Sequence, residues 1–382
     1  LAEITVPASA VSITNSAIKD TRTDDTLCGV TRCLVDKIPV DEFMKNCQAS
    51  FDEWFSLVQA TLGDNAAGQL LNLINGIRED LDNGVYSTTA ILNLYTVPGA
   101  QVTMTIPDDL LGTVTLTATA DANGYAKLYP NKLGNWTAKA VAGGKTYTET
   151  ITVQNIGIFS AAIPSKLENM PWNMISGIGK AGAGPEVLER GATKNITLTT
   201  GEVVTLRLED FNHDDLATGS GKAPFSFMML NLMAATAKMN TTDTNVGGWN
   251  SSAMRTSMST FLAQLPADLR AVIRPVKKKT TAGNKATTIQ TTTDSLWLAS
   301  AKELNLLTTS AGYQDEGETY PLFVDNESRI KKLSNGAGSA NNWWTRSPYT
   351  GGATNFICVY SSGGSNGNYA SNSYGVCLGL CV

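Results

Sequence analysis

Histidine is almost absent from this chain of 382 residues, with His213 as its one example. A Ser-His-Asp hydrolase needs that histidine beside a nucleophile, and no GxSxG sequence supplies a nucleophile elbow. The six cysteines include no CxxC pair, so they lack the usual ligand pattern of a structural zinc site. They are also too few for a disulfide scaffold, and free thiols are typical of a reducing cytoplasm. The sequence therefore predicts no catalytic residue, no metal and no cofactor.

Charge is also scarce, because Asp, Glu, Lys and Arg make up only 16% of the residues and the formal net charge is −5. No strong basic field attracts nucleic acid. No stretch approaches the roughly 20 apolar residues of a membrane span, so we expect no membrane insertion. The first twenty residues lack the basic segment and apolar block of a secretory signal. The basic run RPVKKK at 274–279 favours a solvated surface over a nucleic-acid patch, which needs a basic domain.

Two apolar stripes at helical spacing occupy residues 51–82. In the first, 51–62, aromatic and aliphatic residues recur at i, i+3, i+4, i+7 and i+11. Gly63 ends this helix, and Asp64 is a plausible N-cap for a second helix. Two short amphipathic helices cannot bury their stripes alone. They need copies of themselves in an oligomer, which we favour, or they pack as a hairpin on the next domain.

Apolar and polar residues alternate with period two between residues 90 and 155. The sets at 102–106, 114–118, 136–140 and 147–153 are separated by turn sequences such as DANG and GG. Short strands at regular spacing with such turns predict a small β-sandwich, immunoglobulin-like or similar. No residue in this region suggests chemistry, so we interpret it as a spacer.

Residues 156–382 have an α+β pattern with much loop. We expect strands around 195–209, a helix at about 250–264, and a glycine-rich loop at 175–184. This loop is not a P-loop, because Lys180 is followed by Ala rather than Ser or Thr.

Two further constellations have both chemical and structural interpretations. His213-Asp214-Asp215 suits a metal site or an acid–base pair, but we favour a turn whose Asp side chains cap backbone amides. Cys377 and Cys381 suit a soft metal such as copper, but we favour core thiols of a terminal strand.

The last forty or so residues carry the strongest functional signal. Between positions 349 and 375 about four-fifths of the residues are Asn, Ser, Tyr, Gly or Thr. This is the composition of an antibody paratope, in which Tyr gives rigid contact area and the small polar residues give adaptable hydrogen bonds. A disordered polar tail is the alternative. However, Trp343 and Trp344 precede the segment, and alternating apolar residues up to Val382 follow it and predict a strand.

Motifs upstream of this segment carry a family resemblance. They are LRLEDFNHDDL, NVGGWNSSAMRTSM, LPADLRAVIRPVKKKT, DSLWLASAKEL and NNWWTRSP. Together with the polar segment and the GV…GLCV closure, they resemble the variable proteins of diversity-generating retroelements over roughly residues 165–382. The resemblance implies a C-type lectin fold of the type shared with formylglycine-generating enzymes. In that family, error-prone reverse transcription at adenines rewrites chosen codons of the C-terminal repeat while the fold stays constant.

The same resemblance divides the variable region, about 341–382, into two sets. It implies a buried scaffold of Trp343, Trp344, Arg346, Ser347 and Pro348. It implies that the rewritten, ligand-binding positions are Tyr349, Gly351, Gly352, Thr354, Asn355, Tyr360, Ser361, Ser362, Gly364, Asn366, Gly367, Asn368, Tyr369, Asn372 and Tyr374.

Three further residues of the segment have their own interpretation. Cys358 fits a rewritten Asn codon, whereas Phe356 and Val359 look fixed and inward. The segment contains no Asp or Glu, so we do not expect calcium-mediated sugar binding there. The oxidase relatives need a specific cysteine pair in a pocket, and the spacing of Cys377 and Cys381 departs from theirs. We therefore expect no enzyme, with an oxidase of this type as the weakest alternative.

A second stretch, FDEWFSLVQATLGDNAAGQLLNLIN at 51–75, is similar to the helical base segment of tail-fibre and baseplate-associated proteins from phages of Gram-positive hosts. Together the two resemblances imply a phage receptor-binding protein that is assembled in the bacterial cytoplasm and carried on the virion. Its partners would be a bacterial surface protein or glycan, other tail proteins, and copies of itself, with a trimer favoured. A host-encoded surface adhesin with the same lectin module is the alternative, and the expected lack of a signal sequence argues against it.

The expected organisation is multidomain. An N-terminal α-helical attachment region spans 1–88, an all-β immunoglobulin-like sandwich spans 89–155, and an α+β C-type lectin domain spans 156–382.

Overall fold

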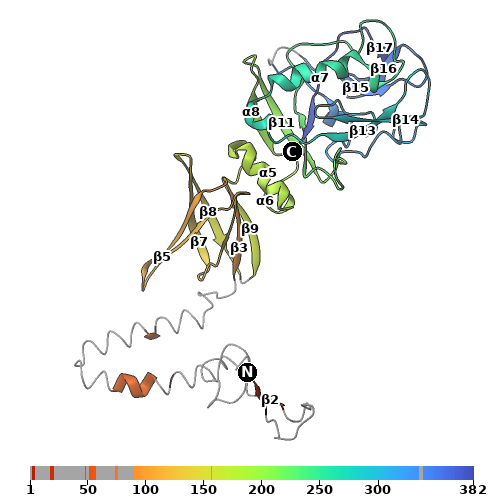
Figure 1. The fold of residues 1–382 in the computed structure, drawn as a ribbon. Coiled ribbons are helices and arrows are strands. Elements are labelled where there is room, and N and C mark those ends of the chain that lie inside the picture. Colours follow the sequence, from red (N-terminus) through yellow and green to blue (C-terminus); the bar gives the residue numbers. More distant parts are fainter. Residues whose placement is uncertain are drawn as a thin grey trace. The chain divides into compact units, whose positions relative to one another are not determined.

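The structure, a computed structural model, describes residues 2–4, 18–20, 48, 51–56, 74–75, 90–155, 157–334 and 339–382. Contacts divide the chain into two units, Leu1–Asn83 and Gly84–Val382. Most regular structure in the described part is β-sheet, with few helices (Figure 1). None of the helices in the described ranges is long and apolar enough to cross a membrane.

The first unit contains a short antiparallel pair, β1 (Ala2–Ile4) with β2 (Ile18–Asp20). Residues 51–56 are helical, as the spacing predicts, and Phe51 contacts the rings of Trp54 and Phe55. Residues 74 and 75 are also helical. The rest of the two expected helices, 51–62 and 64–82, lies outside the described residues.

The second unit begins with two sheets that share one apolar core. The first sheet has the order β5 (Gly112–Thr119), β4 (Gln101–Asp108), β7 (Gly134–Ala142) and β8 (Lys145–Val153), and it is antiparallel throughout. These four strands confirm the period-two pattern, because the alternate residues Val102, Met104, Trp136 and Ala138 are buried.

The period-two pattern of the sequence did not predict the second sheet. It has the order β6 (Tyr125–Leu128), β3 (Ile91–Thr96) and β9 (Ile158–Ile163), and β9 runs parallel to β3. Strand β9 lies beyond the expected boundary at residue 155, yet it is hydrogen-bonded into this sheet. The two-sheet region therefore extends through β9.

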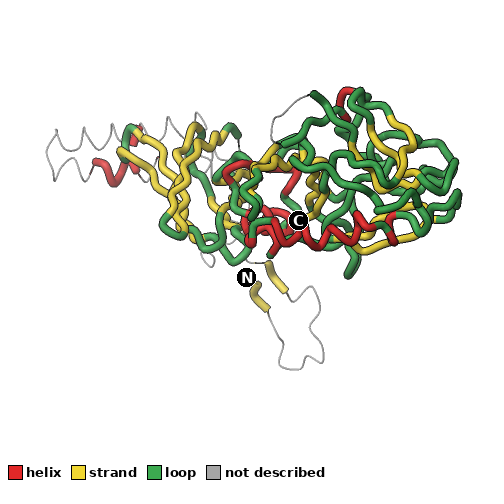
Figure 2. The backbone as a smooth tube through the Cα atoms, turned by 90° about the horizontal axis from the view of Figure 1, so that it is seen from above, coloured by secondary structure: helices red, strands yellow, loops and turns green. Residues whose placement is uncertain are grey.

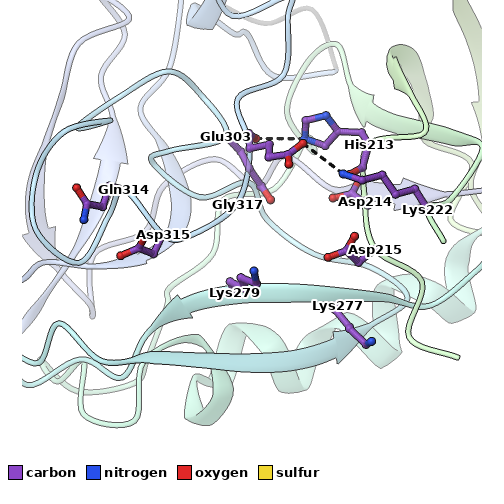
Figure 3. Close-up of a pocket in the computed structure, with 11 residues that line it drawn as sticks. His213, Asp214, Asp215, Lys222, Lys277, Lys279, Glu303, Gln314, Asp315 and Gly317 are labelled. Atoms are coloured by element: carbon purple, nitrogen blue, oxygen red, sulfur yellow. Dashed lines mark hydrogen bonds and ion pairs between the residues drawn. The ribbon is translucent and has the colours of Figure 1, made fainter. Parts of the chain in front are cut away.

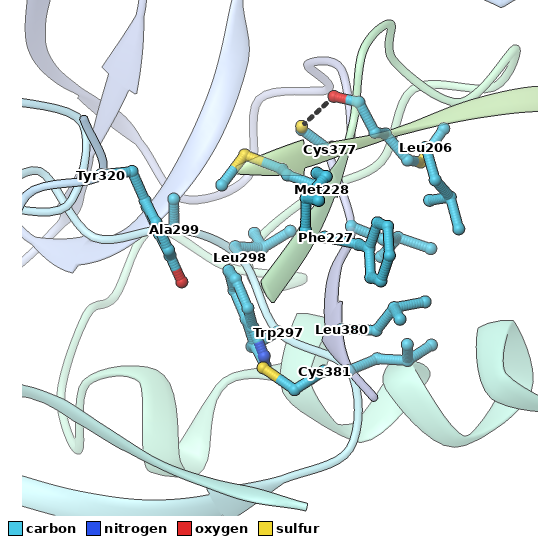
Figure 4. Close-up of a cluster of buried hydrophobic side chains, with 14 of the residues drawn as sticks. Leu206, Phe227, Met228, Trp297, Leu298, Ala299, Tyr320, Cys377, Leu380 and Cys381 are labelled. Carbon is cyan, nitrogen blue, oxygen red and sulfur yellow. Dashed lines mark hydrogen bonds between the residues drawn. The ribbon is translucent and has the colours of Figure 1, made fainter. Parts of the chain in front are cut away.

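The remainder of the chain is organised around a four-stranded antiparallel sheet. Its order is β10 (Thr193–Thr197), β11 (Val203–Phe211), β12 (Phe225–Met229) and β18 (Gly379–Cys381). The predicted strands at 195–209 and at the C-terminal end are confirmed. Figure 4 shows how Leu206, Phe227 and Leu380 of this sheet meet the buried segment that begins at Trp297.

The prediction of a glycine-rich loop at 175–184 is wrong. Helix α5 (Trp172–Lys180) and the short α6 (Gly184–Val187) cover this stretch except for a turn at 181–183. Its glycines permit close packing: a Cβ at Gly177 would lie 2.0 Å from the carbonyl oxygen of Asn123, and one at Gly179 would lie 2.8 Å from Pro224. Tight packing therefore holds a helix that the weak helix propensity of glycine does not favour.

The predicted helix at 250–264 is confirmed as α7 (Ala253–Gln264), which is preceded by η4 (Trp249–Ser251). The Ser252 side chain caps it by accepting a hydrogen bond from the Arg255 amide. A short helix, α8 (Ala267–Arg270), follows. Much of this region is loop around short strands (Figure 2).

Two smaller sheets complete the region. One is the hairpin of β13 (Val276–Thr281) and β14 (Ile289–Asp294). The other joins β15 (Trp343–Pro348), β16 (Asn355–Val359) and β17 (Ser365–Tyr369) in that order. This three-stranded sheet carries the five expected scaffold residues and five of the fifteen expected ligand-binding positions, and most of the other positions lie in its turns.

Candidate ligand-binding surface

Strand β15 is buried along its whole length, including all five residues of the expected scaffold. Trp343 donates through Nε1 to the carbonyl of Arg329 at 3.1 Å, and Trp344 donates to the carbonyl of Ala237 at 2.9 Å. Both indoles therefore combine apolar burial with a satisfied N–H group. The strand is a rigid base for the residues that follow it.

A buried ionic network anchors β15 through the side chain of Arg346. The Arg346 guanidinium contacts both carboxylate oxygens of Glu303, at 2.6 and 2.9 Å. Lys278 contacts Glu303 at 3.1 Å and Asp214 at 2.5 Å, and its ammonium lies 3.4 Å from the ring centre of Trp297. Two cations thus meet two carboxylates, which is how buried charge is tolerated.

This network corrects two predictions. Lys278 is not part of a solvated run, because it is buried between its carboxylate partners. Asp214 does not cap backbone amides: its side chain accepts hydrogen bonds from Ser226, Lys278 and Tyr320. Burial alone would raise the pKa of Asp214, but the Lys278 charge, His213 and the hydrogen bonds from Lys278 and Ser226 together more than offset it, so the pKa lies below its usual range.

A third buried carboxylate, Glu316, ties β15 to β13. Its side chain accepts hydrogen bonds from the Ser347 hydroxyl, the Thr281 amide at 2.9 Å and the Thr280 hydroxyl at 3.0 Å. Burial raises the pKa of Glu316 to about 6, with these hydrogen bonds opposing the rise.

The turn between β15 and β16 is held by Asn245, which is fully buried. Its Nδ2 donates to the carbonyls of Tyr349, Gly352 and Asn355 at 3.2, 2.9 and 2.7 Å. Its Oδ1 accepts from the amide of Asn284 at 2.8 Å. Sequence reasoning missed this residue, although it lies in the NVGGWN motif that carries the resemblance.

The fifteen expected ligand-binding positions share one property, which is that none of them is buried. They alternate with, or lie beside, the buried residues Phe356, Ile357 and Val359 of β16. The structure brings them together on β16, β17 and the turns around these strands (Figure 1). None of the fifteen carries a formal charge.

Asn368 is the centre of a small hydrogen-bonded cluster on this surface. Its Nδ2 lies 3.0 Å from the Sγ of Cys358 and 3.5 Å from the hydroxyl of Tyr360, and the Tyr374 hydroxyl donates to its Oδ1 at 3.2 Å. The Tyr374 ring packs on Trp344 with centroids 4.8 Å apart. Tyr360 and Tyr374 are therefore half-buried and also support the frame.

The exposed aromatic rings of the surface are Tyr349, 36% exposed, and Tyr369, 54% exposed. Tyr349 lies against two glycines, because a Cβ at Gly351 or Gly367 would come within 2.7 Å of its ring. The absence of a side chain at these two glycines leaves the room that the ring occupies. The arrangement offers rigid aromatic area with amide and hydroxyl groups around it.

Cys358 lies on the inner side of this surface. Its thiol is buried, and burial raises its pKa to about 12. The structure therefore does not display Cys358 as a contact residue, although the sequence allows it as a rewritten codon.

Cys377 and Cys381 are free and buried, as the core-thiol interpretation predicts. Cys377 donates to the carbonyl of Met229 (Figure 4), and Cys381 lies 3.3 Å from Asp214. Within the described ranges, no group of three or more His, Cys, Asp or Glu side chains has an arrangement that could hold a metal ion.

Comparison with known proteins adds a family match over part of the chain. Residues 226–382 match a family described as a domain of unknown function, DUF6273. The matched span begins at β12 and includes the ionic partners Lys278, Glu303 and Arg346 as well as the three-stranded sheet. No curated protein matches the chain.

Proposed function

We propose that this chain is a phage receptor-binding protein whose C-terminal domain has a C-type lectin fold and binds a bacterial surface ligand. The two-sheet region is an immunoglobulin-like spacer, and the N-terminal region attaches the protein to the tail and forms an oligomer. A retroelement that rewrites adenine-containing codons diversifies the binding surface. One observation carries the proposal: fully buried residues and unburied polar residues are interleaved within the last forty residues.

A binding surface that changes its side chains needs a frame that does not depend on them. Here the buried polar anchors of the frame, Glu303, Glu316 and Asn245, lie outside the fifteen positions. Of the fifteen, Tyr360 and Tyr374 also pack against the frame. Five of the fifteen positions lie in β16 and β17, and the others lie in the adjoining turns or in the segment after β17. This separation supports sequence diversification without loss of folding.

The surface itself suits recognition rather than catalysis. It combines two exposed tyrosine rings with Asn, Ser and Gly, and its fifteen positions are neutral. Tyrosines supply contact area at low entropic cost, and the small polar residues supply hydrogen bonds. A single flat surface of this kind gives modest affinity, which several copies on one virion raise through avidity.

The test is binding of the purified, fluorescently labelled chain to intact cells from a panel of Gram-positive bacteria. Tyr349→Ala combined with Tyr369→Ala should abolish binding to any strain that the unchanged chain labels. Tyr129→Ala is the matched control, because Tyr129 is 59% exposed but lies just after β6, outside the fifteen positions. Unchanged labelling by the double variant, or equal loss with Tyr129→Ala, would contradict the proposal.

The proposed diversification by a retroelement can be tested separately in the DNA. The coding sequence for residues 341–382 should have a near-identical second copy close to a reverse-transcriptase gene. The two copies should differ only at positions where one of them has an adenine. A locus with no second copy would remove the retroelement from the proposal and leave the binding test intact.

A further inference from the structure

A pocket of about 270 Å³ lies in the C-terminal domain, and none of its lining residues belongs to the fifteen surface positions. One wall is strand β13, and the others are the segment 213–215 and the loop 314–318 (Figure 3). The volume lies just below the usual range for ligand pockets, roughly 300–1,000 Å³, so it suits a small ligand.

Strand β13 contributes two exposed lysines to the lining of this pocket. Lys277 and Lys279 are exposed, while Lys278 between them is buried and paired. Alternation along a strand explains this, because successive side chains point to opposite faces. In the described part of the chain, neither Lys277 nor Lys279 takes part in an ion pair. The wall therefore offers two uncompensated positive charges.

The edge of the same strand adds a backbone donor. The amide of Lys277 bonds to the carbonyl of Asp215 at 2.8 Å, and that of Thr281 bonds to the Glu316 carboxylate at 2.9 Å. Because antiparallel pairing alternates, the Lys279 amide between them points to the same edge. Among the described residues, no acceptor outside the β13–β14 ladder is paired with it. A free N–H at the backbone of Lys279 suits an anion that the lysine side chains also attract.

The facing walls carry negative charge. Asp215 and Asp315 are exposed and line the pocket, and in the ranges that the structure describes no lysine or arginine pairs with either carboxylate. The pocket thus holds unpaired charges of both signs. A ligand with one anionic and one cationic end matches this distribution better than a simple anion or cation.

The base of the pocket is fixed by groups that are already satisfied. His213 stacks on Tyr320 with centroids 4.0 Å apart, and its two ring nitrogens lie 3.1 Å from the Asp210 carboxylate and 3.1 Å from the Glu318 carbonyl. Lys222 donates to the His213 carbonyl at 2.8 Å. These contacts hold the loop 314–318 in place and leave Lys277, Lys279, Asp215 and Asp315 for a ligand.

We propose that this pocket binds a small aminoalkyl phosphate, a ligand that joins a phosphate to a primary ammonium group. The phosphate lies against Lys277, Lys279 and the Lys279 amide. Phosphate fits this wall because lysines bind it as point charges, and no arginine fork that would select a planar carboxylate lines the pocket. The ammonium group lies against the carboxylates of Asp215 and Asp315.

The probe for the test is O-phosphoethanolamine, titrated calorimetrically into the full chain. We expect saturable binding of one molecule per chain. Lys279→Gln and Lys277→Gln should each weaken it about tenfold, the worth of one charge-assisted hydrogen bond. Asp315→Asn should weaken it as well. Lys180→Gln is the matched control, because Lys180 is exposed at the end of α5 and should leave the titration unchanged.

Two further measurements test whether the ligand needs both charged ends and whether it is a free molecule or a lipid headgroup. Inorganic phosphate and ethanolamine should each bind more weakly than O-phosphoethanolamine, and a component that binds equally well would overturn the two-ended ligand. Saturable binding of the free compound together with no binding to phosphatidylethanolamine vesicles identifies a soluble or polymer-borne ligand. Binding to the vesicles as well extends the site to a lipid headgroup. No saturable heat at millimolar probe, or equal weakening by Lys180→Gln, would refute the pocket as a site.

Discussion

Asn245 and Asn366 are two asparagines on opposite sides of the proposed division between frame and surface. Asn245 is fully buried and donates to three carbonyls of the turn between β15 and β16. Asn366 is exposed, and within the described ranges its side chain has one hydrogen bond, which it accepts from the adjacent Gly367 amide. Asn245→Ala removes these donors and also leaves the Asn284 amide without its acceptor. We expect a loss of about 3 kcal/mol in the free energy of unfolding, since each unsatisfied buried group costs about 1–3 kcal/mol.

For a domain of this size, such a loss lowers Tm by about 6–12 °C. Asn366→Ala should change the free energy of unfolding by less than about 0.5 kcal/mol, as surface substitutions do. Differential scanning calorimetry of the two variants and the unchanged chain measures both. The reasoning fails if Asn245→Ala leaves Tm unchanged, or if Asn366→Ala lowers it as much.

The remaining predictions concern the buried groups beneath the surface. Burial raises the pKa of Glu316 to about 6 from 4.5, so the folded chain keeps a proton there that the unfolded chain loses earlier. Stability should then fall by about 2 kcal/mol as pH rises through this window. Denaturant titrations should show that Glu316→Gln lacks this fall, and equal pH slopes would contradict it. Lys278→Met removes a charged partner of the buried carboxylates of Asp214 and Glu303 and should lower the free energy of unfolding by about 3–5 kcal/mol. Lys277→Met, on the exposed face of the same strand, should leave it almost unchanged. Equal losses in the two variants would show that the network contributes little. Gly177→Ala should lower Tm despite the better helix propensity of alanine, because the Cβ would lie 2.0 Å from the Asn123 carbonyl. Gly364→Ala should leave Tm unchanged, because its Cβ would lie 3.9 Å from the Ser362 hydroxyl, an ordinary contact distance.

The parts of the fold that the sequence predicted are those with local patterns. Period-two alternation identified β4, β5, β7 and β8, and the apolar residues at the C-terminal end identified β18. Strands β3 and β9 were missed because they pair in parallel across more than sixty residues, and such pairing has no local signature. Helix α5 was missed because its glycines suggest a loop until the packing against Asn123 is known.

The candidate surface was expected from composition and from the family resemblance, and neither distinguishes a displayed side chain from a supporting one. Tyr360 and Tyr374 resemble Tyr349 in the sequence, yet they pack against the core and bond to Asn368. Lys278 looked solvated because its partners Asp214 and Glu303 lie 64 and 25 residues away. These roles depend on long-range contacts, which a single sequence does not contain.

The central claim is that the fifteen surface positions determine binding while the buried frame determines folding. Two surface-displayed libraries test it most directly, one randomised at the fifteen positions and one at Trp343, Trp344, Arg346, Ser347 and Pro348. Each library is sorted for protease-resistant folded protein and for labelling of the bacterial strain that the unchanged chain binds. The account predicts that most surface variants stay folded but lose or change cell binding, whereas most frame variants unfold. Surface variants that unfold as often as frame variants, or that all keep the original binding, would contradict it.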